Sequence, residues 1–200
     1  MRVGPWIAAT AIALLGQPAV AQTRVQAEAE VKVANGRHFV ALMRYAGLDD
    51  AEYVRRMPEG ESRYTIDRDG VWLTSATGKE QLDPDLGLWV LSHNFHAQIL
   101  DFARLNGGVT RHALRQVGCD CEEVRGKRAA PALGILHLSL IIEREGGKAR
   151  RILIHRKGAA PVVSIFSDWR MSGGNSLPFT MDVDDGKDRY AFRFTSVTVE

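Results

Sequence analysis

The sequence predicts a mainly β protein of the α+β class, in which a strongly curved antiparallel sheet, or incomplete β-barrel, encloses one long helix. The first observation is a succession of about eleven strand-like apolar segments, separated by turn signals such as Asn35-Gly36 and Gly146-Gly147. The second is that the one long helical pattern, residues 83–105, carries apolar side chains on nearly every side. Such a helix must be covered on most sides, and a sheet that wraps around it would provide that cover.

The first strands are predicted by alternation and by turns. In Val25–Val33, five apolar residues alternate with polar ones, which favours a strand over the competing Ala-rich helix. Asn35-Gly36 then predicts a hairpin with Arg37–Tyr45, and residues 62–66 and 71–75 flank Asp69-Gly70 in the same way. Between these hairpins, Leu48–Met57 is predicted to be helical, because acidic residues lie near its start, arginines near its end, and Pro58 follows it.

The long helix is predicted to begin with Asp83 as its N-cap and Pro84 in its first position, and to end near Leu105 before Asn106-Gly107-Gly108. The chain then returns to strands, and Ala132–Arg144 is apolar on both faces apart from His137 and Ser139. The strands predicted in this half are residues 110–117, 119–124, 132–144, 148–157, 163–170, 177–183 and 189–199.

The charge balance and the N-terminus indicate where the protein works. A net charge of +2 over 200 residues gives no bulk attraction for nucleic acid. The basic Arg2, the apolar Ile7–Leu15 and the small residues Ala19-Val20-Ala21 form the three parts of an export signal; the alternative is an ordinary helix. We expect a signal peptide over residues 1–21, cleaved after Ala21, a single domain over 22–200, and a periplasmic location.

The C-terminal segment, residues 161–199, carries a family resemblance. It contains, in order, Ser167-Asp168-Trp169-Arg170, a glycine turn, Leu177-Pro178-Phe179, an acidic glycine turn, and Arg193-Phe194-Thr195-Ser196-Val197. This order resembles the C-terminal part of LolA-like periplasmic proteins, the outer-membrane lipoprotein carrier superfamily. The resemblance implies a half-barrel sheet, capped by helices, around an apolar cavity that accepts acyl chains. The carrier begins with a helix before its first strand, unlike this chain, and no ligand-contacting residue is transferred from it.

The expected ligand is an acyl chain, a lipid or a lipidated protein, held between the curved sheet and the helix at 83–105. Candidate ligand-binding residues are the large apolar side chains on the elements that should face one interior, together with one histidine. A pocket lined by such residues is typical of apolar ligand sites, although the same residues also suit a packed core. They are Trp72, Trp89, Phe95, His96, Ile99, Phe102, Leu138, Phe166 and Trp169.

Cys119 and Cys121 are the only cysteines. In an oxidising compartment this pair suits a local disulfide, a redox site or a metal site. Residues i and i+2 of a strand lie about 6.5–7 Å apart, at the edge of the disulfide range, so a bridge here would be strained and easily reduced.

The histidines offer two pairs. His93 and His96 have the i, i+3 spacing of zinc ligands, but no third ligand follows at a fixed offset. His137 and His155 lie on neighbouring predicted strands and would pair across the hairpin at 146–147 only in a register that the sequence leaves open. We expect these histidines to be satisfied polar residues, and we expect no metal and no cofactor.

Two charged groups complete the inventory. The acidic run at 182–188 fails the calcium-loop template and is typical of a solvated hairpin tip. Basic residues on adjoining strands could meet anionic lipid head groups, a membrane surface or an acidic partner surface, or could simply protect sheet edges. These basic residues are Arg125, Lys127, Arg128, Lys148, Arg150, Arg151, Arg156 and Lys157.

The favoured hypothesis is a periplasmic binding or carrier protein for a hydrophobic ligand. No catalytic motif stands out, so an enzyme is not the expectation. The alternative from another class is a redox or metal-dependent module that uses Cys119 and Cys121 or the histidines. A structural protein with a solid interior is the third.

Overall fold

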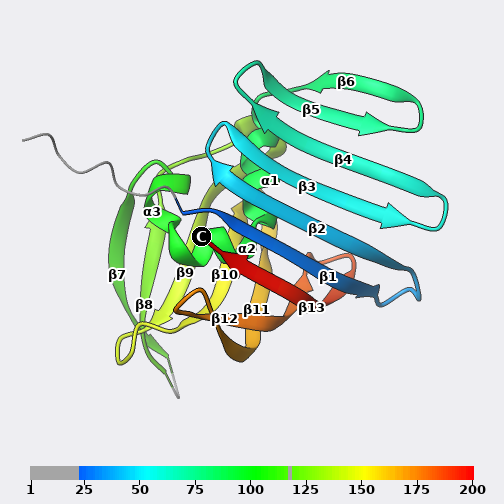
Figure 1. Ribbon diagram of the computed structural model, residues 1–200. Coiled ribbons are helices and arrows are strands. Elements are labelled where there is room, and N and C mark those ends of the chain that lie inside the picture. The colour runs from blue at the N-terminus through cyan, green and yellow to red at the C-terminus, as the bar shows by residue number, and fades with distance from the viewer. Residues whose placement is uncertain (1–22, 117–118) are drawn as a thin grey trace, which may run out of the picture.

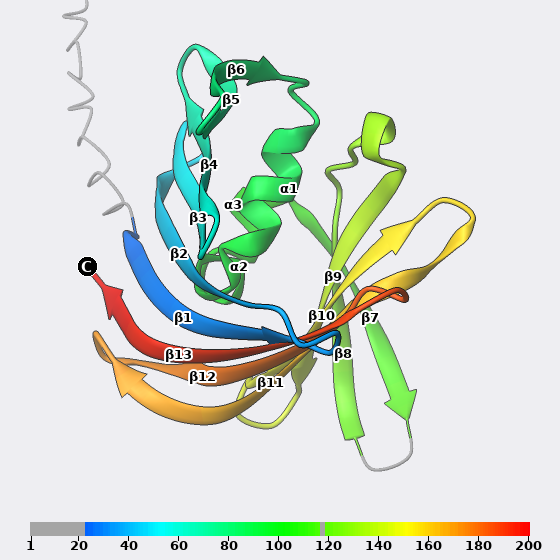
Figure 2. The same ribbon diagram turned by 90° about the vertical axis from the view of Figure 1, so that its right-hand side faces the viewer.

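Alternating apolar segments and tight turns assemble into one large antiparallel sheet in the computed structural model, which describes residues 23–116 and 119–200. Three short helices, α1 (Leu86–His93), α2 (Phe95–Leu100) and α3 (Phe102–Leu105), lie in the concavity of the sheet (Figures 1 and 2). The predicted signal peptide, residues 1–21, lies outside the described residues.

The sheet has 13 strands. In chain order they are β1 (Val25–Val33), β2 (His38–Gly47), β3 (Asp50–Met57), β4 (Gly60–Asp67), β5 (Gly70–Ser75), β6 (Gly78–Leu82), β7 (Val109–Gln116), β8 (Cys119–Gly126), β9 (Ile135–Glu143), β10 (Ala149–Arg156), β11 (Ala159–Ser172), β12 (Asn175–Asp184) and β13 (Arg189–Val199).

The strand order joins two meanders at the centre of the sheet. β1–β6 form one meander and β7–β13 the other, and β1 pairs with β13, so that Val25 lies opposite Val199 and Val33 opposite Tyr190. β6 and β7 are the two edges, and the sheet does not close between them. The predicted curved, incomplete barrel is confirmed, with 13 strands in place of about eleven. The two additional strands are β3 and β6.

The period-2 pattern of β1 sets which face of the sheet is buried. Every second residue from Val25 to Val33 is buried, and the polar residues between them are exposed. The paired strand β2 continues the same inner face with Ala41, Met43 and Tyr45, all of them buried. The prediction of a strand over 25–33 is therefore confirmed to the residue.

The prediction of a helix over Leu48–Met57 is wrong, because residues 50–57 form strand β3. β3 is hydrogen-bonded to β2 on one side and to β4 on the other. Ala51 and Tyr53 point inward and are buried, which is the period of a strand. The charged residues that suited a helix dipole instead serve ion pairs between strands.

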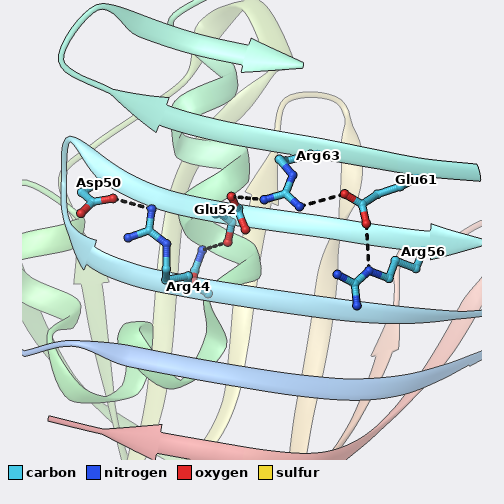
Figure 3. Close-up of polar contacts among 7 residues, drawn as sticks. Arg44, Asp50, Glu52, Arg56, Glu61 and Arg63 are labelled. Carbon is cyan, nitrogen blue, oxygen red and sulfur yellow. Dashed lines mark hydrogen bonds and ion pairs between the residues drawn. The ribbon is translucent and has the colours of Figure 1, made fainter. Parts of the chain in front are cut away.

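These ion pairs lie on the outer face of β2, β3 and β4 (Figure 3). Arg44 pairs with Asp50 at 2.6 Å, and Arg63 bridges Glu52 at 2.8 Å and Glu61 at 2.9 Å. Arg56 reaches the same Glu61 at 2.8 Å. Opposite charges on facing strands stabilise a particular register, so the outer face helps to fix the strand pairing that displaces the helix.

The prediction of one continuous helix over 83–105 is also wrong. Two breaks divide this segment into α1, α2 and α3. At the first break, the side-chain amide of Asn94 donates to the carbonyls of Val90 at 3.2 Å and Glu52 at 3.3 Å. The second break lies at Asp101, with φ −140° and ψ 36°. Side-chain hydrogen bonds of this kind compete with the helix ladder. The expected stop at Asn106 is confirmed, whereas the start lies at Leu86 rather than at Pro84.

The helices fill the concavity with their apolar side chains, as their pattern requires. Leu88, Val90, Phe95 and Phe102 are buried in the same cluster as the inward residues of β1, β2 and β13. The side-chain nitrogen of Asn106 donates to Gln98 at 2.8 Å and to the Phe102 carbonyl at 2.9 Å, whereas its Oδ1 is buried without a hydrogen-bond partner. Within the described ranges, none of the helices has the length and hydropathy that crossing a bilayer would require.

Candidate ligand-binding cavity

A cavity of about 320 Å³ lies between the helices and the inner face of the sheet. This central cavity is at the small end of the range for small-molecule sites. Its walls come from β3, α1, the start of α2, the segment leading into β9, and β9–β13. The lining residues are Arg55, Trp89, Ser92, His93, Phe95, Leu133, Ile135, Ile154, Arg156, Val162, Ser164, Val183, Asp185, Tyr190 and Phe192.

The apolar part of the lining follows from strand alternation on β10–β13. Ile154 and Val162 face each other across the β10–β11 pair, and Val183 faces Tyr190 across β12–β13. Facing residues of an antiparallel pair share one side of the sheet. The inward side chains of four successive strands therefore form a continuous apolar wall opposite the helices.

The helix side of the cavity is aromatic. Trp89 and His93 are one helical turn apart on α1, and their rings lie 4.2 Å apart between centroids. Tyr53 of β3 packs against both, at 5.6 Å from Trp89 and 4.5 Å from His93. Phe95 extends the series to Phe192 of β13 at 5.4 Å. These contacts attach the helix wall to both halves of the sheet.

Arg55 places a positive charge in this aromatic setting. Its guanidinium carbon lies 5.8, 5.4 and 5.5 Å from the ring centroids of Phe39, Tyr53 and Trp89, which is the range of cation–π contacts. Its Nε is buried and has no hydrogen-bond partner, and no carboxylate within residues 23–116 and 119–200 forms an ion pair with it. A guanidinium carries five donors and stays charged, so Arg55 has donor capacity left for a ligand.

The second arginine of the cavity is already occupied. Arg156 donates to the carbonyls of Ala160 at 2.7 Å and Asp185 at 2.9 Å. The Asp185 carboxylate also accepts from the Tyr190 hydroxyl at 3.4 Å. These bonds fix the turn between β12 and β13 at the cavity wall. Arg55 is thus the better placed of the two to meet an anionic group.

The two histidines of the helical segment are neutral at neutral pH. Burial lowers the pKa of His93 to about 3, and the charge of Arg55 acts in the same direction. Its Nδ1 donates to the Trp89 carbonyl at 2.8 Å, which leaves Nε2 as an acceptor. Burial also lowers the pKa of His96 to about 4, and its Nε2 donates to the Pro178 carbonyl at 2.8 Å. The two rings do not share a metal-binding position, because His93 Nδ1 and His96 Nε2 are bonded to the carbonyls of two different residues, Trp89 and Pro178.

A second hollow, the rim groove, adjoins the central cavity. Its volume is about 500 Å³, and it lies between the β1–β2 turn and the β3–β4 turn. Arg55 and Tyr190 line both spaces. The groove therefore borders the charged end of the central cavity.

The residues predicted to bind the ligand fall into three groups. Trp89 and Phe95 line the central cavity. His96, Phe102, Leu138 and Phe166 are buried in the core, and Ile99 and Trp169 pack against it.

Trp72 lies apart from the other eight. It alternates with the inward Val71, donates from Nε1 to Asp67 at 3.0 Å, and carries Lys79 Nζ at 4.3 Å from its ring. Some of the nine predicted residues therefore line the cavity, and others pack in the core.

Of the other sequence motifs, the cysteine pair does not line the central cavity, whereas the acidic turn contributes Asp185 and the basic set contributes Arg156 to the lining. Cys119 and Cys121 form a disulfide, with Cα atoms 5.3 Å apart. The acidic turn at 184–188 is a hairpin tip, in which the Asp185 carboxylate accepts from the backbone of Lys187 and Asp188 at 2.8 Å. Several of the basic residues are used internally, such as Arg150 with Glu143 at 2.9 Å and Lys148 over the Trp169 ring at 5.0 Å.

Arg55 is the charged cavity residue that sequence reasoning missed. Its inward position follows once residues 50–57 are taken as a strand, because Ala51, Tyr53 and Arg55 then share one face. An arginine in phase with buried residues is the signal that identifies it. Tyr190 and Phe192 were also available from the alternation of β13, where they point inward.

Comparison with known proteins identifies the fold and leaves the sequence family open. No family model matches the chain, and no curated protein matches it in sequence. Several solved structures are similar to this chain. A LolA superfamily protein from Nitrosomonas europaea has a TM-score of 0.61 at 11% identity, covering 90% of this chain and 87% of that one.

The other two similar structures have comparable scores. A domain provisionally named for outer membrane lipoprotein sorting, from Vibrio parahaemolyticus, has a TM-score of 0.60 at 8% identity, covering 89% of this chain and 85% of that one. A DUF1329 family protein from Desulfovibrio piger has a TM-score of 0.56 at 11% identity, with coverage of 90% and 87%. The LolA-like resemblance is thus confirmed as a fold.

Proposed function

We propose that this protein is an exported carrier that binds a hydrophobic ligand in the central cavity. The ligand is an acyl chain, a lipid or the lipid moiety of a lipidated protein. The observation that carries the proposal is the combination of an apolar cavity between sheet and helices with Arg55, whose buried Nε has no hydrogen-bond partner. The LolA-like fold, shared with a LolA superfamily protein and with a domain provisionally named for outer membrane lipoprotein sorting, supports the same class of function.

The chemistry of the walls suits an amphipathic molecule. Burying an apolar chain contributes about 25 cal/mol for each Å² removed from water, and Ile154, Val162, Val183 and Phe192 supply the surface. This contribution depends little on the shape of the ligand, so the tail provides affinity rather than selectivity. A carrier that must release its ligand benefits from such a non-directional interaction.

Arg55 would select the other end of the ligand. A buried charge without a hydrogen-bonded anion is costly, whereas a guanidinium forms strong paired bonds with carboxylate and phosphate groups. An anionic head at Arg55 would therefore be favoured over a neutral one. The rim groove beside Arg55 and Tyr190 would let the head remain near solvent while the tail enters the cavity.

Export and membrane contact belong to the same proposal. The signal peptide predicted over residues 1–21, with cleavage after Ala21, would deliver the mature chain to the periplasm. Contact between the basic residues of 125–128 and 148–157 and anionic lipid head groups stays a prediction. Such contact would bring the carrier to the surface from which it loads or to which it delivers.

Native mass spectrometry of the protein secreted by a bacterial host tests the proposal. We expect a population heavier than the polypeptide by the mass of a lipid, which organic extraction removes and lipid analysis then identifies. The variant Trp89→Ala should lose most of this population, because Trp89 lines the cavity. The matched variant Trp72→Ala, outside the cavity, should keep it. A protein that neither co-purifies with a lipid nor binds added fatty acid would refute the carrier function.

A further inference from the structure

A second polar cluster lies on the opposite face of the sheet from the cavity. His137 of β9 and His155 of β10 are directly paired across the two strands, and their rings stack with centroids 4.2 Å apart. Leu138 and Ile154, their neighbours in sequence, face the core and the central cavity. Alternation therefore places the two imidazoles on the convex side.

Glu123 of β8 completes the cluster. One ligand atom from each of Glu123, His137 and His155 lies within 4.8 Å of the other two. Within the cluster, His155 Nε2 lies 3.9 Å from Glu123 Oε1, which is within ion-pair distance. Ligands of a tetrahedral zinc ion are about 3.3 Å apart, given bonds of about 2.0–2.1 Å. Small side-chain rotations would bring the ligand atoms from their present separations to this zinc-bound distance.

The hydrogen bonds around the cluster leave one ligand atom, His137 Nε2, without a partner and engage the other two through Ser139. Arg125 binds Glu123 Oε2 at 3.1 Å, which holds the carboxylate and directs Oε1 toward Ser139 at 2.6 Å. The Ser139 hydroxyl also lies 3.1 Å from His155 Nε2. His137 Nε2 is buried and has no hydrogen-bond partner. A buried polar atom without a partner is unusual in a folded protein and indicates a missing ligand or water.

We propose that Glu123, His137 and His155 form a binding site for a divalent transition metal, zinc being the best match. Two imidazoles and one carboxylate form the ligand set of zinc sites that keep a fourth position for water. Ser139 would then be a neighbour that is displaced from Glu123, and Arg125 would orient the carboxylate from behind. Orientation of a ligand by a second residue is usual in metal sites.

The protonation of the imidazoles suits this role. Burial, the charge of His155 and the charge of Arg125 lower the pKa of His137. Burial and Arg125 lower the pKa of His155, while Glu123 acts in the opposite direction. These effects favour the neutral imidazole, which is the form that binds metal. The site is separate from the central cavity, so the metal-site proposal does not depend on the carrier function.

Calorimetric titration of the tag-free, chelator-treated protein with zinc chloride tests the site. We expect one zinc ion per chain, and visible ligand-field bands when cobalt(II) is used as a probe. His137→Gln and His155→Gln should each weaken zinc binding at least tenfold. His38→Gln, on an exposed residue of β2, should bind as the unaltered protein does.

Imidazole proton resonances give a readout that needs no variant to fold. In the unaltered protein, the signals of His137 and His155 should shift on addition of zinc, while those of the other histidines stay in place. Absence of zinc binding would overturn the proposal. So would zinc binding that is equally strong in both glutamine variants, or resonance shifts confined to other histidines.

Discussion

The guanidinium carbon of Arg55 lies 5.5 Å from the centre of the Trp89 ring, so that a charge on strand β3 covers an aromatic side chain on helix α1. The contact joins the two walls of the central cavity at the end that borders the rim groove. It gives a hydrophobic space one polar terminus. The first two predictions address each end of this space.

Replacing Arg55 should remove the preference for an anionic head group. In Arg55→Met, we expect the affinity for a long-chain fatty acid to fall about tenfold, the size of one charge-assisted hydrogen bond. The affinity for the alcohol of the same chain length should change little. Calorimetry with both ligands measures the two affinities. The control is Arg56→Met, since Arg56 lies on the outer face and pairs with Glu61 at 2.8 Å. Equal losses for acid and alcohol would argue against head-group selection.

Filling the cavity should abolish binding without unfolding the protein. Ile154 lines the cavity, so Ile154→Trp places a larger ring in the ligand space. Bound lipid should disappear from the native mass spectrum, while the melting temperature stays close to that of the unaltered protein. Ile165→Trp provides the control, because Ile165 is 54% exposed on the neighbouring strand. Retention of lipid in Ile154→Trp would place the ligand elsewhere.

The stability of the fold should depend on the neutral form of His96. Burial lowers the pKa of His96 in the folded state to about 4 from its usual 6.5, so the unfolded chain binds more protons between these values. The contribution of His96 to the free energy of unfolding is therefore fully present above pH 6.5 and is lost as the pH falls toward 4. Between pH 7 and pH 5 the loss amounts to about 2 kcal/mol.

Urea unfolding of His96→Gln measures this contribution. Glutamine can still donate to the Pro178 carbonyl that His96 Nε2 reaches at 2.8 Å, but it does not titrate. The free energy of unfolding should therefore fall less between pH 7 and pH 5 in the variant than in the unaltered protein. The same decrease in both proteins would show that His96 does not control acid sensitivity.

Two glycines should respond oppositely to alanine. A Cβ atom on Gly126 would lie 2.5 Å from Cβ of Asn106, which sits in the buried network at the end of α3. Gly126→Ala should therefore destabilise the protein by about 1–3 kcal/mol, as overpacking does. On Gly87 of α1, the nearest atom to a new Cβ is Val71 Cγ2 at 3.4 Å. Gly87→Ala should be neutral, or stabilising by about 0.5–1 kcal/mol through helix propensity. Thermal unfolding compares the two, and a stable Gly126→Ala would contradict the tight contact.

The elements that sequence alone could locate are those whose signals are local. The alternation of Val25–Val33 and the turn at Asn35-Gly36 depend on residues next to one another, and both are reproduced in β1 and β2. Residues 50–57 were misassigned because their strand character comes from pairing with β2 and β4. Pairing across strands is a tertiary effect that overrides a weak local propensity.

For the site residues too, the sequence identified those with a local signal and missed those that depend on strand pairing. Trp89 and Phe95 were found because the helix pattern marked them, and they line the cavity. Arg55 was missed because its inward direction depends on the strand assignment of β3. His137 and His155 were recognised as a pair, but only the register of β9 and β10 places them directly opposite each other. Glu123, the third member of that cluster, comes from a strand whose register the sequence does not encode locally.

Pairing of β1 with β13 at the centre of the sheet has a consequence for biogenesis. Ribosomes make the chain from its N-terminus, so β1 emerges first and its partner last. Until the final residues arrive, β1 has one unpaired edge, and an unpaired edge invites association with other chains. The β1–β6 meander can therefore form early as a hairpin array, but the concave interior is completed only after β13 has been made. Truncation at the C-terminus, even by one strand, should leave an aggregating product rather than a smaller domain.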